Sequence, residues 1–144
     1  MSETVRAGTP ADLGNIADHY AHEDTPWDPF GSVERLSRIP LDGLLVAEVD
    51  GRYAGFLYWF EGHSPYFRPG LERFGYLYEL HVKEEFRGRG LATKMIERFF
   101  ADAQARGIHQ LFVDTDDTNT GARRLYEGLG FLRYRDVVHY ELEV

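Results

Sequence analysis

The 144-residue chain has no cysteine. Disulfide bonds, thiolate metal sites and a cysteine nucleophile are therefore excluded. Long hydrophobic runs are also missing, because no stretch approaches the roughly 20 apolar residues that a membrane-spanning helix requires. The first residues, Met1 to Arg6, lack the apolar segment of a secretion signal. These absences predict a cytoplasmic protein with no membrane partner.

Basic charge is scarce as well. The chain carries 16 Lys and Arg against 24 Asp and Glu, which gives a formal net charge of −8. A nucleic-acid partner usually requires a basic face, so none is expected. An acidic surface attracts cationic small molecules, although it also serves solubility alone. Repeats and low-complexity tracts are absent too, and the length predicts a single domain spanning residues 1–144.

The pattern of apolar residues and turn signals predicts alternating secondary structure. Strands are expected at 5–7, 44–49, 53–60, 74–82, 108–113 and over 133–142. Helices are expected from Thr9–Pro10 onward and at 32–38, 91–106 and 121–128. Asp50-Gly51 predicts a tight hairpin turn, and Gly107 is placed to end the third helix. This order favours a mixed sheet with helices on its faces, within the α/β (α+β) class.

A glycine-rich segment at a strand-to-helix junction is the clearest candidate for a binding site. Gly88 and Gly90 precede the helix that begins at Leu91, and Arg87, Arg89 and Lys94 add positive charge. Glycines let the backbone approach a ligand, and a helix N-terminus favours an anion such as a pyrophosphate. The alternative is a solvated basic turn. Neither the G-x-G-x-x-G dinucleotide motif nor the G-K-[ST] of a P-loop is present.

Two motifs together carry a family resemblance. Arg87-x-x-Gly90-x-Ala92 follows a strand ending in Leu80-His81-Val82, and the segment 119–131 reads NTGARRLYEGLGF. Both motifs, in this order, resemble the signatures of the GNAT superfamily of N-acetyltransferases. The resemblance covers the element order of the whole chain. It implies a GNAT-like mixed, mostly antiparallel sheet of about six to seven strands flanked by about four helices, and acetyl-CoA as co-substrate.

The resemblance also implies which residues contact the cofactor. Backbone N–H groups of the loop would hold the CoA pyrophosphate, and the preceding strand would splay and pair its backbone with the pantetheine arm. Asn119 resembles a cofactor-contacting asparagine, and it is also a good helix N-cap. The implied cofactor-binding set is Leu80, His81, Val82, Arg87, Gly88, Arg89, Gly90, Leu91, Ala92, Thr93, Asn119 and Tyr126.

The implied reaction is direct attack of an amine on the thioester. Tyr126 matches a tyrosine that protonates the departing thiolate; otherwise it is a core aromatic beside Ala122 and Leu125. Glu79 and His81 lie two apart on one strand and share a face, so either is a candidate base, or else an ordinary polar residue of the sheet. No metal is expected. His19 and His22 have helical spacing, but without further ligands they indicate a surface helix.

Three further segments and a group of aspartates bear on the identity of the acceptor. The segment 76–82, the run 90–93 and the ending 137–142 look similar to aminoglycoside 3-N-acetyltransferases of the GNAT type. A small cationic amine therefore competes with a protein N-terminus or lysine as acceptor, and a non-catalytic acyl-CoA-binding module is the alternative of another class. Asp114, Asp116 and Asp117 suit a cation but also suit a solvated loop. The loops around Trp27 and Tyr66-Phe67 are expected to shape the acceptor pocket. A homodimer is common in the family.

Overall fold

The computed structural model describes residues 2–21, 29–63, 72–133, 138 and 140–144. Contacts divide the chain into two units, Met1–Asp114 and Thr115–Val144, and the prediction of a single domain is not tested by that division. The second unit holds one helix, α4 (Thr120–Gly128). The first unit contains the other helices and strands: β1 (Glu3–Ala7), α1 (Leu13–Ala21), α2 (Val33–Leu36), β2 (Leu44–Val49), β3 (Arg52–His63), β4 (Arg73–Val82), α3 (Leu91–Ala105) and β5 (Leu111–Val113).

The strands form one five-stranded sheet in the order β1-β2-β3-β4-β5. β1 to β4 pair antiparallel with their neighbours, and β5 joins β4 in parallel. The prediction of a mixed, mostly antiparallel sheet is therefore confirmed. The expected count of six to seven strands is wrong for the described residues, which form five.

The difference in strand count arises at the end of the chain. The strand predicted over 133–142 has a period-two apolar pattern, but residues 134–137 and 139 lie outside the described part. Among the described ones, Val138, Tyr140 and Leu142 are exposed and outside any strand. An alternating pattern stabilises a strand only where a neighbouring strand accepts its hydrogen bonds and its apolar face is covered.

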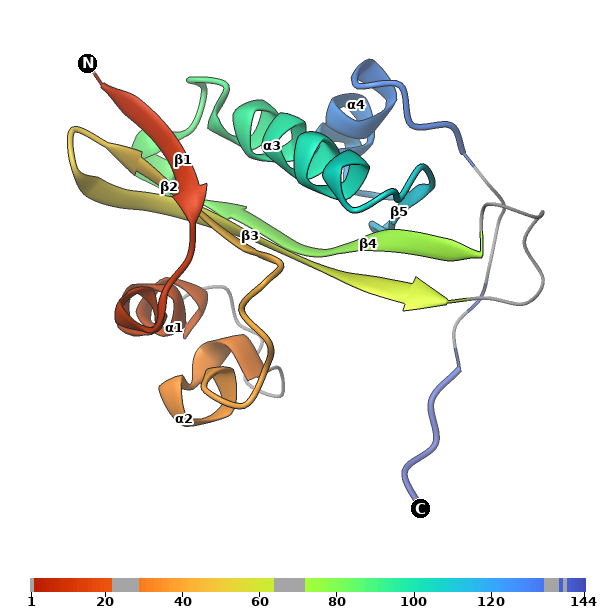
Figure 1. Ribbon diagram of the computed structural model, residues 1–144, viewed down its shortest axis with the longest axis horizontal. Helices are drawn as coiled ribbons and strands as arrows, with labels where there is room; N and C mark the ends of the chain where they lie inside the picture. Colours follow the sequence, from red (N-terminus) through yellow and green to blue (C-terminus); the bar gives the residue numbers. More distant parts are fainter. Residues whose placement is uncertain (1, 22–28, 64–71, 134–137, 139) are drawn as a thin grey trace. The chain divides into compact units, whose positions relative to one another are not determined.

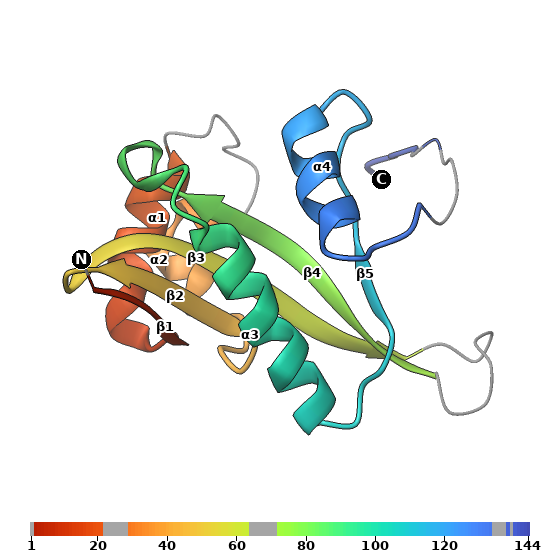
Figure 2. The same ribbon diagram turned by 90° about the horizontal axis from the view of Figure 1, so that it is seen from above.

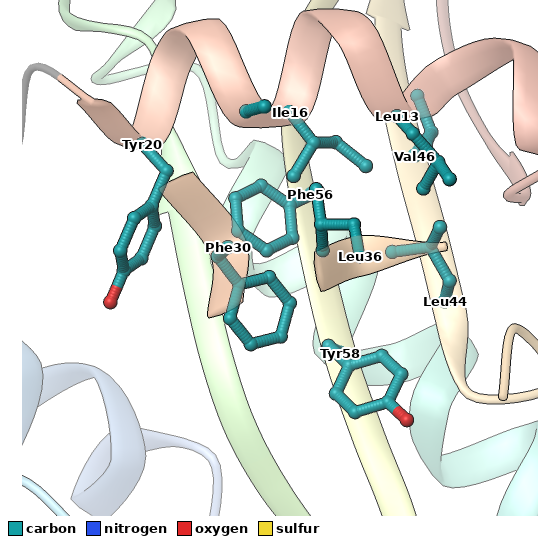
Figure 3. Close-up of a cluster of buried hydrophobic side chains, with 10 residues drawn as sticks. Leu13, Ile16, Tyr20, Phe30, Leu36, Leu44, Val46, Phe56 and Tyr58 are labelled. Atoms are coloured by element: carbon teal, nitrogen blue, oxygen red, sulfur yellow. The ribbon is translucent and has the colours of Figure 1, made fainter. Parts of the chain in front are cut away.

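Helices cover both faces of the sheet in the first unit (Figure 1). α1 and α2 lie on one face, where they enclose an apolar cluster with β2 and β3 (Figure 3). The members of that cluster are Leu13, Ile16, Ala17, Tyr20, Phe30, Leu36, Leu44, Val46, Phe56 and Tyr58. α3 crosses the opposite face (Figure 2) and contacts β1, β2, β3 and β4.

The predicted signals at the ends of α3 are confirmed. The helix spans the 15 residues Leu91–Ala105 and buries one face through Met95, Ile96 and Phe99. Gly107 has φ +77°, and the Ile108 N–H donates back to the Ala103 carbonyl at 2.9 Å. Ile108 thus closes the helix, which is why β5 begins only at Leu111 and is shorter than the predicted strand 108–113.

An ion pair anchors the entry to α1. Arg6 on β1 donates to both carboxylate oxygens of the buried Asp12 at 2.8 and 2.7 Å, and the Thr9 N–H donates to the same carboxylate at 2.8 Å. The predicted helix start at Thr9-Pro10 is seen as a short 3-10 turn, Pro10–Asp12, that leads into α1. The Arg6 guanidinium beside Asp12 holds the pKa of that carboxyl below its ordinary value.

We expect Asp12→Asn to lower the free energy of unfolding by about 1.5 kcal/mol at pH 7, since water partly screens Arg6. An unfolded aspartate titrates near pH 3.9, and the folded-state pKa is depressed, so this stability is present above about pH 4 and lost as pH falls. Urea unfolding at pH 7 and pH 3 measures it. The exposed Glu34–Arg38 pair supplies the control, because Glu34→Gln should change little. An Asp12→Asn loss that is undiminished at pH 3 would contradict the assignment.

Candidate cofactor and acceptor site

A β-bulge in β4 determines which groups the strand presents. Tyr58 of β3 pairs with Glu79 and the next residue, Trp59, pairs with Leu77, so Tyr78 is an extra residue on β4. Before the bulge, Gly75 and Leu77 face the α3 side, where a Cβ on Gly75 would meet Phe99. After it, Glu79 and His81 face the α1 side instead. A bulge inserts one residue and re-aims the side chains beyond it.

Beyond the same bulge, two peptide groups of β4 point away from β3, toward the outer edge of the sheet. The Lys83 N–H donates to the Ala54 carbonyl of β3 at 2.8 Å. Peptide groups alternate sides along a strand, so those of Leu80 and Val82 point away from β3. β5 pairs with β4 only at Gly75–Leu77, so in the described residues no strand pairs with this outer edge. Leu80 and Val82 therefore offer an open edge to which an extended, amide-rich ligand can add, and the splay of this strand stays a prediction.

The loop after β4 has the geometry of an anion site. Gly88 and Gly90 both have φ +79°, a left-handed conformation that other residues rarely adopt. The first bond of α3 runs from the Lys94 N–H to the Gly90 carbonyl at 3.0 Å. The N–H groups of Leu91, Ala92 and Thr93 therefore have no acceptor within the helix. Together with the helix dipole, they favour an anion at this end of α3.

The basic side chains of the loop are held by the protein itself. Arg87 Nε donates to the Val82 carbonyl at 3.0 Å, which ties the loop to the open edge of β4. The Arg89 guanidinium lies over the ring of the buried Phe86, 5.6 Å from its centroid. Lys94 was expected, like the two arginines, to add positive charge to the loop, and its Nζ lies 2.6 Å from a carboxylate oxygen of Glu3. The predicted anion site therefore consists of the backbone N–H groups and the two arginines.

Glu79 and His81 come together as the sequence predicts. His81 Nε2 lies 2.5 Å from one carboxylate oxygen of Glu79, and the Tyr20 hydroxyl donates to the other at 3.3 Å. The His81 ring stacks on Phe56 with centroids 5.2 Å apart. Both side chains stay partly accessible, at 20% for His81 and 17% for Glu79. A carboxylate paired with an imidazole at an accessible surface can take a proton from a bound molecule.

His19 and Tyr20 belong to this cluster and were not predicted as site residues. His19 was interpreted as part of a surface helix, but it is 7% exposed, and its Nδ1 lies 2.8 Å from the hydroxyl of Tyr53. Its ring meets that of His81 edge-on at 6.1 Å. Burial raises the pKa of Tyr53, so this hydroxyl stays protonated. The signal available in the sequence was that both residues occupy the apolar stripe of α1.

Asn119 and Tyr126 lie in the second unit. Asn119 caps α4, because its Oδ1 accepts from the Ala122 N–H at 3.0 Å, so the N-cap interpretation is confirmed. Tyr126 is half-buried and meets Phe131 edge-on at 5.8 Å. Among the described residues, none of α4 is buried. Contact of either residue with a cofactor stays a prediction.

The structure describes some of the residues that were predicted to bind the acceptor, but not the two acceptor loops. The loops around Trp27 and Tyr66-Phe67 lie outside the described residues. Asp114 accepts a hydrogen bond from the Tyr76 hydroxyl of β4, and Asp114, Asp116 and Asp117 are all exposed. Within the described ranges, no three His, Asp or Glu residues are grouped to hold a metal ion. No helix in those ranges is long and apolar enough to span a membrane.

Comparison with known proteins gives a family match over most of the chain. The model of the acetyltransferase (GNAT) family matches residues 13–131. The chain is also similar to a mycothiol acetyltransferase of Salinispora tropica, with 34% identity over 128 residues. That match covers 88% of this chain and 37% of the relative, so the chain spans just over a third of the relative's length.

Two solved structures share the fold at low sequence identity. The aminoglycoside acetyltransferase AAC(6')-Iy, in complex with a bisubstrate analogue, has 21% identity and a TM-score of 0.82 over 100% of both chains. A ribosomal-protein-alanine N-acetyltransferase from Brucella melitensis has 22% identity and a TM-score of 0.76, covering 99% of this chain and 100% of its own. These three relatives are named for different acceptors. The resemblance to aminoglycoside 3-N-acetyltransferases stays a prediction.

Proposed function

Because this chain belongs to the acetyltransferase (GNAT) family, we propose that it transfers an acetyl group from acetyl-CoA directly to a primary amine of a small cationic molecule. The observation that carries the proposal is the open edge of β4 at Leu80 and Val82, which runs into the N-terminus of α3 through two left-handed glycines. The edge fits an amide-rich arm, and the helix end fits a pyrophosphate. The two sites are joined by the loop that holds Arg87 against Val82.

Leu80 brings the reacting carbonyl beside a base. Its outward N–H lies in the chain between Glu79 and His81, whose side chains share one face of the sheet. A thioester oxygen bonded to that N–H is stabilised as negative charge develops on it. The acetyl carbon then lies near the Glu79–His81 pair, on the side from which an amine can approach. We therefore propose that this pair accepts the proton of the amine.

The bonds and protons of the transfer balance without a covalent enzyme intermediate. An alkylammonium has a pKa near 10.4 and must lose a proton before its nitrogen can attack. Glu79–His81 takes this proton, directly or through water. The new C–N bond forms as the C–S bond breaks, the amine's second proton is released, and the CoA thiolate leaves. A tyrosine is protonated at neutral pH and can supply the proton that the thiolate needs.

We propose Tyr126 for that last role, and Tyr126→Phe tests it. The variant keeps the ring that packs on Phe131 but removes the hydroxyl. The expected result is a fall in kcat of about 10-fold to 100-fold, within the range of acid–base contributions, with a smaller loss of affinity for CoA. Steady-state kinetics and calorimetry measure the two quantities. Tyr140→Phe is the matched control, since Tyr140 is 93% exposed. Equal turnover in wild type and Tyr126→Phe would remove Tyr126 from the mechanism.

A small cation is favoured as acceptor by charge. The net charge of −8 attracts cations to the protein, and Glu79 places a carboxylate at the site itself. A protein or peptide N-terminus is the competing acceptor, and one of the similar structures is named for such an activity. The discriminating property is the affinity for free amines, because a peptide acceptor derives most of its binding from residues beyond the amine.

The proposal is tested by following free CoA thiol with acetyl-CoA and a panel of amines. The panel includes alkylamines, diamines, amino sugars, lysine and short peptides with a free N-terminus. We expect release with cationic small amines, at a rate that increases with amine concentration. Release of CoA with peptides alone would show that the acceptor is a peptide N-terminus and not a small cationic amine. Tight CoA binding without release for any amine would indicate a non-catalytic acyl-CoA-binding module.

A further inference from the structure

Three aromatic side chains form a strip on β3 and β4 that the mechanism does not use. Phe60 stacks on Tyr76 with centroids 5.4 Å apart and an interplanar angle of 17°, and it lies 6.0 Å from Tyr78. Phe60 is 41% exposed and Tyr78 is 44% exposed. We call Tyr78, Phe60 and Tyr76 the aromatic strip. Exposed apolar side chains that lie next to one another form a candidate binding surface.

The aromatic strip begins at the proposed reaction centre. Tyr78 is the bulged residue next to Glu79, and its ring lies 5.9 Å from Phe30 in the core cluster. Phe60 and Tyr76 pair further along β3 and β4, the two strands that extend beyond the part of the sheet that α1 and α2 cover (Figure 1). The aromatic strip is therefore continuous with the face that carries Glu79 and His81.

A second carboxylate lies beside the aromatic strip, directly after β5. The Tyr76 hydroxyl donates to Asp114, which follows β5 and is exposed. A carboxylate offers about four acceptor positions, so this bond leaves Asp114 able to receive an ammonium group. Because Leu77 pairs with Val113 in parallel, Asp114 follows β5 at the level of Tyr78, and both carboxylates therefore lie next to the rings.

Charge and shape together specify what fits this surface. Aromatic faces attract cations and pack against the C–H groups of saturated rings. Two carboxylates from different strands, Glu79 and Asp114, select a molecule with two separated ammonium groups. A linear diamine satisfies the carboxylates but covers the rings poorly, and a ring-bearing monoamine leaves Asp114 unused.

We propose that the aromatic strip is the acceptor subsite and that it selects a ring-bearing diamine or polyamine. The reacting amine lies at Glu79, the ring lies on Phe60 and Tyr78, and a second ammonium lies at Asp114. This inference rests on the proposed acetyl transfer and adds the part of the acceptor that does not react.

Four acceptor amines separate the contribution of the ring from that of the second ammonium group. They are bis(aminomethyl)cyclohexane, aminomethylcyclohexane, hexanediamine and propylamine. We expect Phe60→Ala to raise KM about fivefold for the two ring amines and to leave the other two unchanged, as loss of one aromatic face implies. Asp114→Asn, whose amide still accepts from Tyr76, should raise KM for the two diamines only. In both variants kcat with propylamine should match wild type.

Phe60→Leu guards against misfolding, because it keeps apolar cover for the sheet and removes the aromatic face. CoA affinity by calorimetry confirms that each variant is folded. A KM change that is the same for all four amines, or none, would overturn the acceptor subsite while leaving acetyl transfer intact. No CoA release by wild type with any amine would instead overturn the proposed function.

Discussion

Gly90→Ala is expected to weaken CoA binding by about tenfold to a hundredfold. Gly90 has φ +79° and ψ +16°, where an alanine costs roughly 1–2 kcal/mol. A Cβ there meets nothing within 4 Å, so the strain comes from the backbone and not from crowding. The backbone relieves it by rotating, which turns the N–H groups of Leu91 and Ala92 away from the pyrophosphate. One lost bond to a charged group costs about 1.5–3 kcal/mol, and each 1.4 kcal/mol is tenfold in affinity.

The matched control lies at the other end of the same helix. Gly107 has φ +77°, and the nearest atom to an added Cβ is 3.6 Å away, so Gly107→Ala meets similar strain without a clash. The 15-residue helix separates the two positions by roughly 22 Å. Both variants should lose similar stability in urea, but only Gly90→Ala should lose CoA affinity in calorimetry. Equal CoA affinity in the two variants would show that the loop does not hold the pyrophosphate.

Glu79→Gln and His81→Gln should each lower kcat/KM for the amine by about 10²–10³-fold, the usual contribution of a positioned base. The two side chains share a hydrogen bond of 2.5 Å, so we expect them to act as a unit. The double variant should then be little worse than either single one, since losses within a catalytic unit do not add. The Kd for CoA should stay within about twofold of wild type, because neither side chain belongs to the anion site.

Glu61→Gln is the control for this pair. Glu61 is also a carboxylate of the sheet, on β3, and it pairs with Arg73 away from the proposed base. Its loss changes the net charge by the same amount as Glu79→Gln, but kcat/KM should hardly change. If the effects of the two single variants multiply in the double variant, Glu79 and His81 act independently. If only one single variant loses activity, that residue alone is the base.

Much of the fold follows from local patterns in the sequence. The 3.6-residue periodicity of α3 and the left-handed Gly107 determine that helix almost to the residue, and Asp50-Gly51 specifies the hairpin between β2 and β3 through two positive φ values. The ends of strands were less predictable. β5 loses Ile108 to the cap of α3, a competition between a helix and a strand that apolar periodicity does not represent.

The site was predictable where it depends on backbone chemistry and less so where it depends on packing. Gly88 and Gly90 indicate a left-handed backbone conformation, because few other residues adopt it. Glu79 and His81 share a face by simple alternation. By contrast, the burial of His19 depends on Tyr53, which is 34 residues away in the chain. The aromatic strip depends on the register between Phe60 and Tyr76, which only the paired strands reveal.

The extra residue at Tyr78 makes the pairing register of β4 as consequential as its composition. If Tyr78 paired regularly with β3, every later residue of the strand would shift by one position. Glu79 and His81 would then turn toward α3, and the peptide groups of Leu80 and Val82 would turn toward β3. The proposed base and the proposed cofactor edge would disappear in one step, with every residue identity preserved. Substitutions can adjust either function separately, whereas a one-residue slip of this strand affects both.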